Sequence, residues 1–575
     1  MPELKRVARS QEAAFVKRKR AMRVADQILE ILSCHGVRQI FGVPGDAIND
    51  FTFAVSRRND MEFILVRHEE AGAFMAAAQA KLTGRLTACM GTAGPGAVHL
   101  LNGLYDAKQD HAPVIAITGQ VATEFIGTGH PQEINSEQLF GDVAEFTQTV
   151  MVPDQALKLT LEACKAALSA GGVSHVCVPT DVAGKKVTKF RKDLDLGSDL
   201  GQIRPCTPSL DKALALIAEA KKPAILAGIG AASARPKILE LAERLNAPIV
   251  RTLRAKDWID EQEPLCVGGL GLLGSSTGSS VMEKCDLLIL AGSDYPYVTF
   301  YPTKTPIIQI EPDPRRMGRR APISAPLHGH AEPTLDMLLE KVDANPNSSF
   351  LDDILKEKEK ELKAHRKSEE SNATPIKPQR VMAELSDVAP NDTIFLCDVG
   401  TTTAWSARHL RVGPDQRFTL SASYASMAFA LPGAIGAQLA YPDRPVVAIA
   451  GDGGFAMLMA DLVTATRYDL PITCVVFENN SLGFIALEQE AKGLPQHSIE
   501  LVNPDFVKFA DACGARGFRV DQPGALNAVL REAIEHPGPA VVVVEVNPDE
   551  LIIPPRISAE QALNFGLAKI REALV

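Results

Sequence analysis

The stretch Arg444-Pro-Val-Val-Ala-Ile-Ala-Gly451-Asp452-Gly453-Gly454 decides the fold of this chain. An apolar run leads into an acidic glycine turn, and Asn479-Asn480 begins 26 residues after Gly453, at the end of a second apolar run from Ile472 to Phe477. Apolar runs of this length are typical of buried strands, and Phe455 to Tyr468 between them is predicted to be a helix. This order of elements predicts a parallel sheet whose strand ends carry an acid and an amide.

The same alternation of apolar strands and helical patterns runs through the whole chain. Predicted strands are Gln39 to Gly42, Glu62 to Val66, Leu86 to Met90, Val114 to Thr118, His175 to Val178, Ala224 to Ala227, Ile249 to Val250, Leu287 to Ala291, Pro306 to Ile310, Thr393 to Cys397, Val446 to Ala450, Ile472 to Phe477 and Ala540 to Val546. Helices are predicted between them, for example Ala71 to Thr83 and His99 to Gln109. The chain is therefore expected to be an α/β protein of consecutive domains, each a mainly parallel sheet with helices on both faces.

Two polar stretches, Gly184 to Ser209 and Asn345 to Gln379, divide the chain into three blocks. The second contains Lys356-Glu-Lys-Glu-Lys-Glu-Leu-Lys, which predicts a solvated helix beside a flexible connector. The expected domains are 22–190, 205–345 and 375–550. A basic extension, 1–21, is expected to be disordered, and a helical tail is expected at 551–575, with its helix from Ala559 to Leu574.

Composition excludes several classes of function. A net charge of −10 over 575 residues gives no basic field for nucleic acid. There is no run of about 18 apolar residues, which a membrane span would need, and no secretory signal, so a cytoplasmic location is expected. The ten cysteines are scattered without a CxxC pair. We expect them to be reduced core residues, and not ligands of a zinc site.

The opening motif has the residues that a metal and a diphosphate would require. Glycines allow the backbone to approach phosphate closely, and a helix start offers free N–H groups. Mg²⁺ prefers oxygen ligands, so Asp452, the amide oxygen of Asn479 and a carbonyl past the second strand, at Ser481, would suffice. An Asp-Gly turn alone is usually only a turn, but the Asn pair at this spacing, between two apolar strands, strengthens the interpretation.

Further motifs make the chain resemble the thiamine-diphosphate enzymes over nearly its whole length. It is most similar to the pyruvate oxidases, of the quinone-linked pyruvate dehydrogenase type, within the acetolactate synthase-like superfamily. The motifs are Arg67-His-Glu-Glu70, Gly94-Pro-Gly96, Ile126-Gly-Thr-Gly-His-Pro-Gln-Glu133, Tyr301-Pro-Thr303, Cys397-Asp-Val-Gly400 and Ile552-Ile-Pro-Pro555.

The resemblance implies roles for individual residues. Glu69 would face N1′ of the aminopyrimidine ring, and Met427 would be the wedge under the bent cofactor. The implied catalytic residues are Glu69, Gln132, Phe484 and Glu488. The implied thiamine diphosphate-binding residues are Gly45, Met427, Gly451, Asp452, Gly453, Gly454, Asn479, Leu482 and Gly483, with Mg²⁺ held by Asp452, Asn479 and Ser481.

The middle block resembles the FAD-binding segments of pyruvate oxidases. Gly228-Ile-Gly230 follows a predicted strand, a shape that is equally common in structural turns. The implied FAD-binding residues are Leu270, Gly271, Leu272, Leu273, Gly292, Ser293, Asp294, Tyr295, Pro296, Tyr297 and Glu311. Glu311 closes a strand, as a ribose-binding carboxylate would.

The expected function is oxidative decarboxylation of a small 2-oxo acid, pyruvate above all, to acetate or acetyl phosphate and CO₂. Electrons would pass through FAD to quinone or oxygen. The alternative is acetolactate synthase chemistry, in which the flavin is not redox-active. A non-enzymatic relative is disfavoured because Glu69, Asp452 and Asn479 are all present. A homodimer is the expected minimum, and the resemblance points to a homotetramer.

Two departures from the resemblance concern substrate and acceptor. Pro131 precedes Gln132 where a phenylalanine is expected, which leaves the pocket wall and the substrate preference open. The chain ends at Val575, without the lipid-binding peptide of the membrane-activated enzymes, which leaves peripheral membrane contact open.

Overall fold

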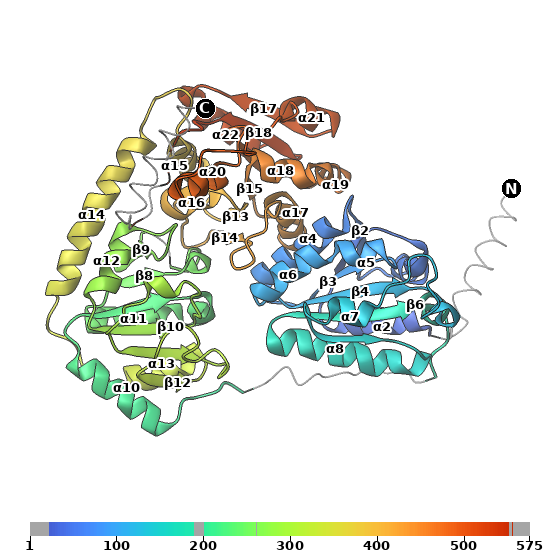
Figure 1. Cartoon of the computed structure of the whole chain (residues 1–575), viewed down its shortest axis with the longest axis horizontal. Helices are drawn as coiled ribbons and strands as arrows, with labels where there is room; N and C mark the ends of the chain where they lie inside the picture. Colours follow the sequence, from blue (N-terminus) through green and yellow to red (C-terminus); the bar gives the residue numbers. More distant parts are fainter. Residues whose placement is uncertain (1–21, 189–200, 260–261, 551, 553–554, 556–575) are drawn as a thin grey trace, which may run out of the picture. The chain divides into compact units, whose positions relative to one another are not determined.

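A computed structural model describes residues 22–188, 201–259, 262–550, 552 and 555 (Figure 1). The chain forms two compact units, one within 1–198 and one within 199–575, and each is described by itself. The extension 1–21 and the predicted helix from Ala559 to Leu574 lie outside the described residues.

The first unit is a six-stranded sheet with the order β2-β1-β3-β4-β6-β5, paired in parallel throughout. Its strands are β1 (Gln39–Gly42), β2 (Glu62–Leu65), β3 (Thr87–Gly91), β4 (Val114–Gln120), β5 (Ala144–Thr149) and β6 (Val173–Pro179). Its helices are α2 (Val24–Cys34), α3 (Asn49–Val55), α4 (Glu69–Thr83), α5 (Pro95–His99), α6 (Leu101–Gln109), α7 (Ser136–Phe140), α8 (Ala156–Ala170) and α9 (Thr180–Ala183).

The second unit begins with a sheet of order β12-β11-β10-β7-β8-β9. Counted from its own first strand, this is the 3-2-1-4-5-6 order of dinucleotide-binding folds, with its switch point between β7 and β10. The strands are β7 (Pro223–Ala227), β8 (Ile249–Arg251), β9 (Cys266–Gly269), β10 (Leu287–Ala291), β11 (Ile307–Glu311) and β12 (Ala325–His328). The helices are α10 (Thr207–Glu219), α11 (Arg235–Leu245), α12 (Ser276–Lys284), α13 (Ala331–Leu339) and the long α14 (Ser349–Glu369).

The last sheet has the order β14-β13-β15-β16-β18-β17, which repeats the order of the first sheet strand for strand. Its strands are β13 (Ile394–Cys397), β14 (Arg417–Leu420), β15 (Val446–Gly451), β16 (Ile472–Glu478), β17 (Arg516–Val520) and β18 (Ala540–Glu545). Its helices are α15 (Pro378–Val388), α16 (Thr401–His409), α17 (Ala430–Ala440), α18 (Asp452–Leu458), α19 (Leu462–Arg467), α20 (Gly483–Ala491), α21 (Phe506–Ala512) and α22 (Leu526–Ile534).

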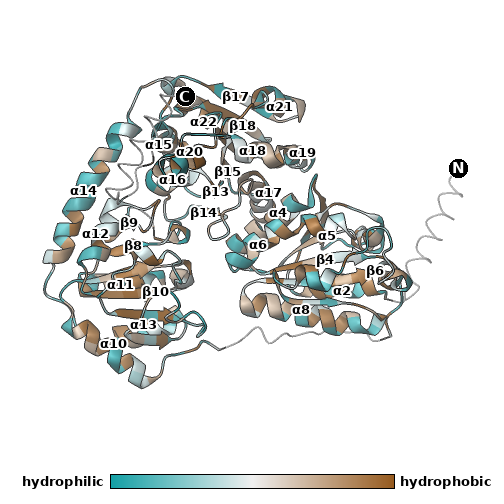
Figure 2. Cartoon of the chain, viewed as in Figure 1, coloured by the Kyte–Doolittle hydropathy of each residue, from teal (hydrophilic) through white to brown (hydrophobic). Residues whose placement is uncertain are grey.

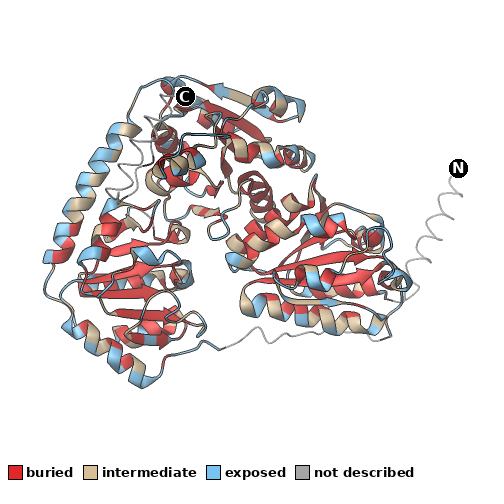
Figure 3. Cartoon of the chain, in the orientation of Figure 1, coloured by how far each residue is buried: buried red, intermediate tan, exposed pale blue. Residues whose placement is uncertain are grey.

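The cores lie between the sheets and the helices that cover them. Figure 2 shows the strands coloured as hydrophobic, and Figure 3 shows them buried. Strands covered on both faces must be apolar along their length, and β4, β7 and β13 are buried at every residue. The predicted α/β class, with three parallel sheets, is confirmed.

Three details differ from the sequence predictions. The predicted helix from Phe455 to Tyr468 is divided into α18, a short 3₁₀ turn (Met459–Asp461) and α19. The predicted helix from His99 to Gln109 is α6, preceded by α5. Five strands, β5, β9, β12, β14 and β17, were not predicted at all.

The cysteine prediction holds in part. All ten cysteines are free, but Cys34 and Cys206 are exposed and Cys513 is half-buried, so these three are not core residues. Among the helices of the described residues, none combines the length and apolar character needed to cross a bilayer.

Candidate active site

Asp452 lies where β15 ends and α18 begins, and its carboxylate is held by four hydrogen bonds. Oδ2 accepts the backbone N–H groups of Asn479 (3.1 Å) and Asn480 (2.6 Å) and Nδ2 of Asn503 (3.0 Å). Oδ1 accepts the N–H of Gly453 at 2.8 Å. Asp452 is 2% exposed, and this burial raises its pKa above the ordinary value despite the donors. A bound cation would favour the ionised form of such a carboxylate.

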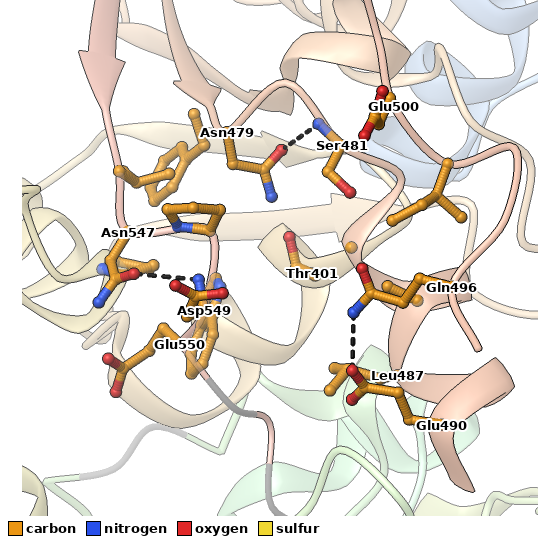
Figure 4. A pocket seen from close by; sticks show the side chains of 18 of the residues that line it. Thr401, Asn479, Ser481, Leu487, Glu490, Gln496, Glu500, Asn547, Asp549 and Glu550 are labelled. Carbon is orange, nitrogen blue, oxygen red and sulfur yellow. Dashed lines mark hydrogen bonds between the residues drawn. The ribbon is translucent and has the colours of Figure 1, made fainter. Parts of the chain in front are cut away.

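Asn479 lines a cavity of about 870 Å³ at the carboxyl edge of the last sheet (Figure 4). Its Oδ1 accepts the N–H of Ser481 at 3.1 Å, and Ser481, Gly483 and Thr401 line the same cavity. The far wall carries Glu490, which is 2% exposed and accepts a hydrogen bond from Nε2 of Gln496 at 2.7 Å. A cavity of this size, with a few converging polar groups, suits a small organic ligand.

Asp398, which follows β13, is a second buried carboxyl group at this edge. Its Oδ1 accepts the N–H groups of Val399 (3.0 Å) and Phe429 (3.1 Å), while Oδ2 has no hydrogen-bond partner among the described residues. Burial raises the pKa of Asp398 to about 7. A Cβ placed on Gly454 would overlap Oδ2, so Gly454 is required for the close packing of α18 on Asp398.

Met427 lies in a strained segment that faces the glycine turn. Ala425 and Ala428 have φ values of 60° and 70°, a region that residues other than glycine seldom occupy. A Cβ on Gly453 would lie 3.5 Å from Cε of Met427, so the methionine contacts the turn that carries Asp452. Strain of this kind persists where the surrounding structure imposes it, often at ligand sites.

Glu69 is the first residue of α4 in the first unit and is 7% exposed. Its Oε2 lies 3.0 Å from Nδ1 of His99, whose ring stacks on His68 with 4.4 Å between centroids. A Cβ on Gly96 would lie 3.2 Å from Oε1 of Glu69, so the Gly94-Pro-Gly96 turn covers the carboxylate. His99 was not predicted as a site residue.

The same turn also contacts the loop that carries Gln132. Gly94 and Gln132 both have positive φ, 63° and 67°, and a Cβ on Gly94 would lie 2.8 Å from the carbonyl oxygen of Gln132. Gly45, after β1, packs against Thr92, with its Cβ position 2.5 Å from that side chain. The structure thus gathers Glu69, Gly45 and the backbone of Gln132 around one edge of the first sheet.

Each sheet matches a described domain of one enzyme family. The matches are to the thiamine pyrophosphate enzyme N-terminal TPP binding domain over residues 22–139, to the central domain over 210–338 and to the C-terminal TPP binding domain over 398–544. The chain belongs to the thiamine pyrophosphate enzyme family. The match spans all three sheets, so the resemblance seen in the sequence motifs is confirmed at the level of the family.

Relatives within the thiamine pyrophosphate enzyme family have different names. A thiamine pyrophosphate-containing protein of Bacillus subtilis is 40% identical over 93% of this chain and 94% of its own length. A pyruvate oxidase of Lactiplantibacillus plantarum is 32% identical over 88% of this chain and 85% of its own. A probable acetolactate synthase large subunit of Methanocaldococcus jannaschii is also 32% identical, over 93% of this chain and 94% of its own.

The residues around Asp452 fit the cofactor of this family. Asp452 and Asn479 offer the oxygen ligands that Mg²⁺ prefers. A Cβ on Gly451 would meet no atom within 4 Å, so open space lies beside the turn where a diphosphate could approach the backbone. Asn503, 51 residues beyond Asp452, was missed because nothing in its sequence neighbourhood marks a strand end.

Helix α20, beyond the Asn pair, separates the two catalytic residues that were predicted there. Phe484 is half-buried and packs against the core of the last domain. Glu488 is exposed and does not line the cavity, whereas Glu490 on the same helix does. Leu482, just before the helix, is held by its N–H bond to the carbonyl of Ile499 at 2.8 Å.

The segments predicted to bind FAD gather at the carboxyl edge of the middle sheet. The N–H groups of Gly228 and Gly230 donate to the carbonyls of Ala291 and Gly292, each at 2.9 Å. These two glycines therefore serve a structural turn. Glu311 is buried, accepts the N–H of Asp313 at 3.0 Å and has its pKa raised by burial.

The same edge offers apolar surface and an unsatisfied hydroxyl. Leu272 is 42% exposed and Tyr297 is 58% exposed. The hydroxyl of Tyr295 is buried without a hydrogen-bond partner among the described residues and packs against Gly271. Asp294 is paired with Arg319 and Arg320. An apolar, aromatic surface at a topological switch point fits a flavin nucleotide.

Gly454 and Gly451 provide a matched pair of substitutions. Gly454→Ala is expected to lower the free energy of unfolding by about 1–3 kcal/mol, because its Cβ overlaps the fixed carboxyl of Asp398. Gly451→Ala should change stability by less than about 0.5 kcal/mol but weaken binding of thiamine diphosphate, since its Cβ enters open space beside the turn. Chemical unfolding and cofactor titration check both. Equal stability of the two variants would contradict the packing argument.

Proposed function

We propose that this thiamine pyrophosphate enzyme catalyses oxidative decarboxylation of a small 2-oxo acid, most plausibly pyruvate. The products are acetate or acetyl phosphate and CO₂, and electrons pass through FAD to quinone or oxygen. The observation that carries the proposal is the buried, four-fold hydrogen-bonded Asp452 beside Asn479 and a cavity of about 870 Å³. The pyruvate oxidase relative and the aromatic edge of the middle sheet support the oxidative branch.

The chain's own residues have separable tasks in this proposal. Asp452, Asn479 and the carbonyl of Ser481 would hold Mg²⁺, and the glycines after β15 would admit the diphosphate. Glu69 would hold a proton at the aminopyrimidine ring, and its contact with Nδ1 of His99 fixes the carboxylate for that task. Thiamine diphosphate, when bound, supplies the nucleophilic carbon and the electron sink for decarboxylation.

A second candidate is carboligation of the acetolactate synthase kind, with a flavin that is not redox-active. The acetolactate synthase relative favours it, because its identity equals that of the pyruvate oxidase and its coverage of this chain is larger. Both candidates use the same groups up to the loss of CO₂. They differ only in whether electrons or a second 2-oxo acid complete the reaction.

Anaerobic addition of pyruvate distinguishes the two candidates. For protein loaded with thiamine diphosphate, Mg²⁺ and FAD, we expect the flavin absorbance to bleach as CO₂ is released. An unbleached flavin with acetolactate formed would reject the oxidase. Reoxidation by a soluble quinone or by oxygen, with and without phosphate, then identifies the acceptor and the product. Omission of pyruvate is the control.

We also propose that the enzyme works as a homodimer at least and as a homotetramer in its complete form, in the cytoplasm. The proposal rests on the family resemblance, in which one cofactor is held by two subunits. Sedimentation of the cofactor-loaded protein checks it, and a monomer with full activity would reject it.

A further inference from the structure

Three side chains outside the candidate active site meet where helix α14 ends. His365 and Glu369 are four residues apart on α14, so they share one face of the helix. His409 is the last residue of α16. Each of the three offers one potential ligand atom within 4.8 Å of the other two. Helix and residue spacing thus bring two imidazoles and one carboxylate together.

The cluster is largely shielded from solvent. Nδ1 of His409 lies 2.9 Å from Oε1 of Glu369, and the exposed side-chain fractions are 5% and 14%. The rings of His365 and His409 lie 4.6 Å apart between centroids. Nδ1 of His365 is inaccessible to solvent and has no hydrogen-bond partner within the described ranges. A buried polar atom without a partner is costly and often marks an absent ion or ligand.

From this arrangement we propose that His365, Glu369 and His409 bind one divalent transition metal ion of the zinc class, which fastens α14 to α16. Two imidazole nitrogens and a carboxylate oxygen are a ligand set that Zn²⁺ and Co²⁺ favour. Mg²⁺ prefers oxygen ligands alone, so this site and the Asp452 site select different ions.

The neighbouring arginines leave room for a cation. Nη1 of Arg411 lies 3.7 Å from Oε2 of Glu369, but its Nη2 donates to Asp387 (2.6 Å) and to the carbonyl of Ala383 (3.2 Å). Arg411 is therefore held by other acceptors. Oε1 of Glu369, which faces His409, remains the ligand atom for the metal.

The position of α16 gives the metal site a structural consequence. The helix begins at Thr401, which lines the cavity, and ends at His409. Arg408, next to His409, donates to the carbonyls of Leu272 (3.0 Å) and Gly274 (3.1 Å) in the segment proposed to contact FAD. A metal at His409 would thus hold the end of the helix that supports this segment.

Cobalt titration of the full chain tests the proposal. After chelator treatment, we expect the wild type to bind one equivalent of Co²⁺ with visible d–d absorption, which Zn²⁺ displaces and Mg²⁺ does not. His365→Ala and Glu369→Gln should each weaken binding at this site by at least about 100-fold. His35→Ala is the control, because His35 lies in the other unit, where its ring contacts the carbonyl of Ile31.

Unchanged binding by both variants would overturn the proposal, and would assign the ion to His68, Glu69 and His99, whose ligand atoms are equally close together. Glu369→Gln keeps an acceptor for His409, so the fold is expected to survive, and circular dichroism of the metal-free variant checks this. A further measurement needs no variant. X-ray absorption of the zinc-loaded wild type should show two imidazoles, and a sulfur ligand would reject the site.

Discussion

Glu69→Gln is expected to lower kcat by roughly 10²–10⁴-fold, the usual contribution of a positioned proton-transfer group. Glutamine has nearly the same shape and still offers an oxygen to Nδ1 of His99, which lies 3.0 Å from the carboxylate. It cannot, however, take up or release the proton. CO₂ release from pyruvate, measured with saturating thiamine diphosphate and Mg²⁺, reads the effect directly.

The control for this variant is its neighbour in sequence. Glu70 also lies in the first turn of α4, where its Oε1 accepts Nδ2 of Asn102 at 2.6 Å. Glu70→Gln retains an acceptor there and should keep most of the activity. We expect both variants to bind FAD as the wild type does. If Glu69→Gln turned over at the rate of Glu70→Gln, the role given to Glu69 would be wrong.

Asp452→Asn is expected to weaken Mg²⁺-dependent binding of thiamine diphosphate by at least about 100-fold, with a matching loss of turnover. Both carboxylate oxygens accept N–H groups, so an amide NH₂ in either place faces a donor from Gly453 or from Asn479, Asn480 and Asn503. The substitution therefore removes a metal ligand and also leaves buried donors unsatisfied. Fluorescence titration with cofactor and Mg²⁺ measures the binding.

Asp505→Asn is the matched control for the second variant. Asp505 is also a carboxylate that accepts backbone N–H groups, those of Val507 and Lys508, but it lies at the start of α21 and does not line the cavity. Its substitution should leave cofactor affinity unchanged. Equal cofactor affinity of Asp452→Asn and the wild type would remove Asp452 from the proposed metal site.

The interior of the fold could be predicted from sequence, but most of its edges could not. Every predicted strand is present, and the five missed strands all lie at the edge of a sheet. Edge strands are covered less completely, so they need no continuous apolar run. β12 alternates buried and exposed residues, and β17 is largely exposed. β2 alone among the edge strands was predicted, because its Phe63-Ile-Leu65 core is apolar.

The site divides along the same line between local and distant contacts. Asp452 and Asn479 follow apolar strands directly, so topology alone brings them to one edge. Asn503 lies in a loop, and its bond to Asp452 depends on where that loop folds back. Pairing of Asn480 to Leu482 with Ile499 and Leu501 places the loop, and no spacing rule predicts that pairing.

The identical strand order of the first and last sheets points to their origin. Two sheets with one topology in one chain are most simply explained by duplication of an ancestral domain. Residues at equivalent places can then be compared as descendants. Thr92 in the first copy corresponds to Asp452 in the last, since each follows the third strand. Only one copy thus retains an acid there, and the connection that bears Glu69 in one copy bears Met427 in the other. The two halves have diverged into complementary specialists.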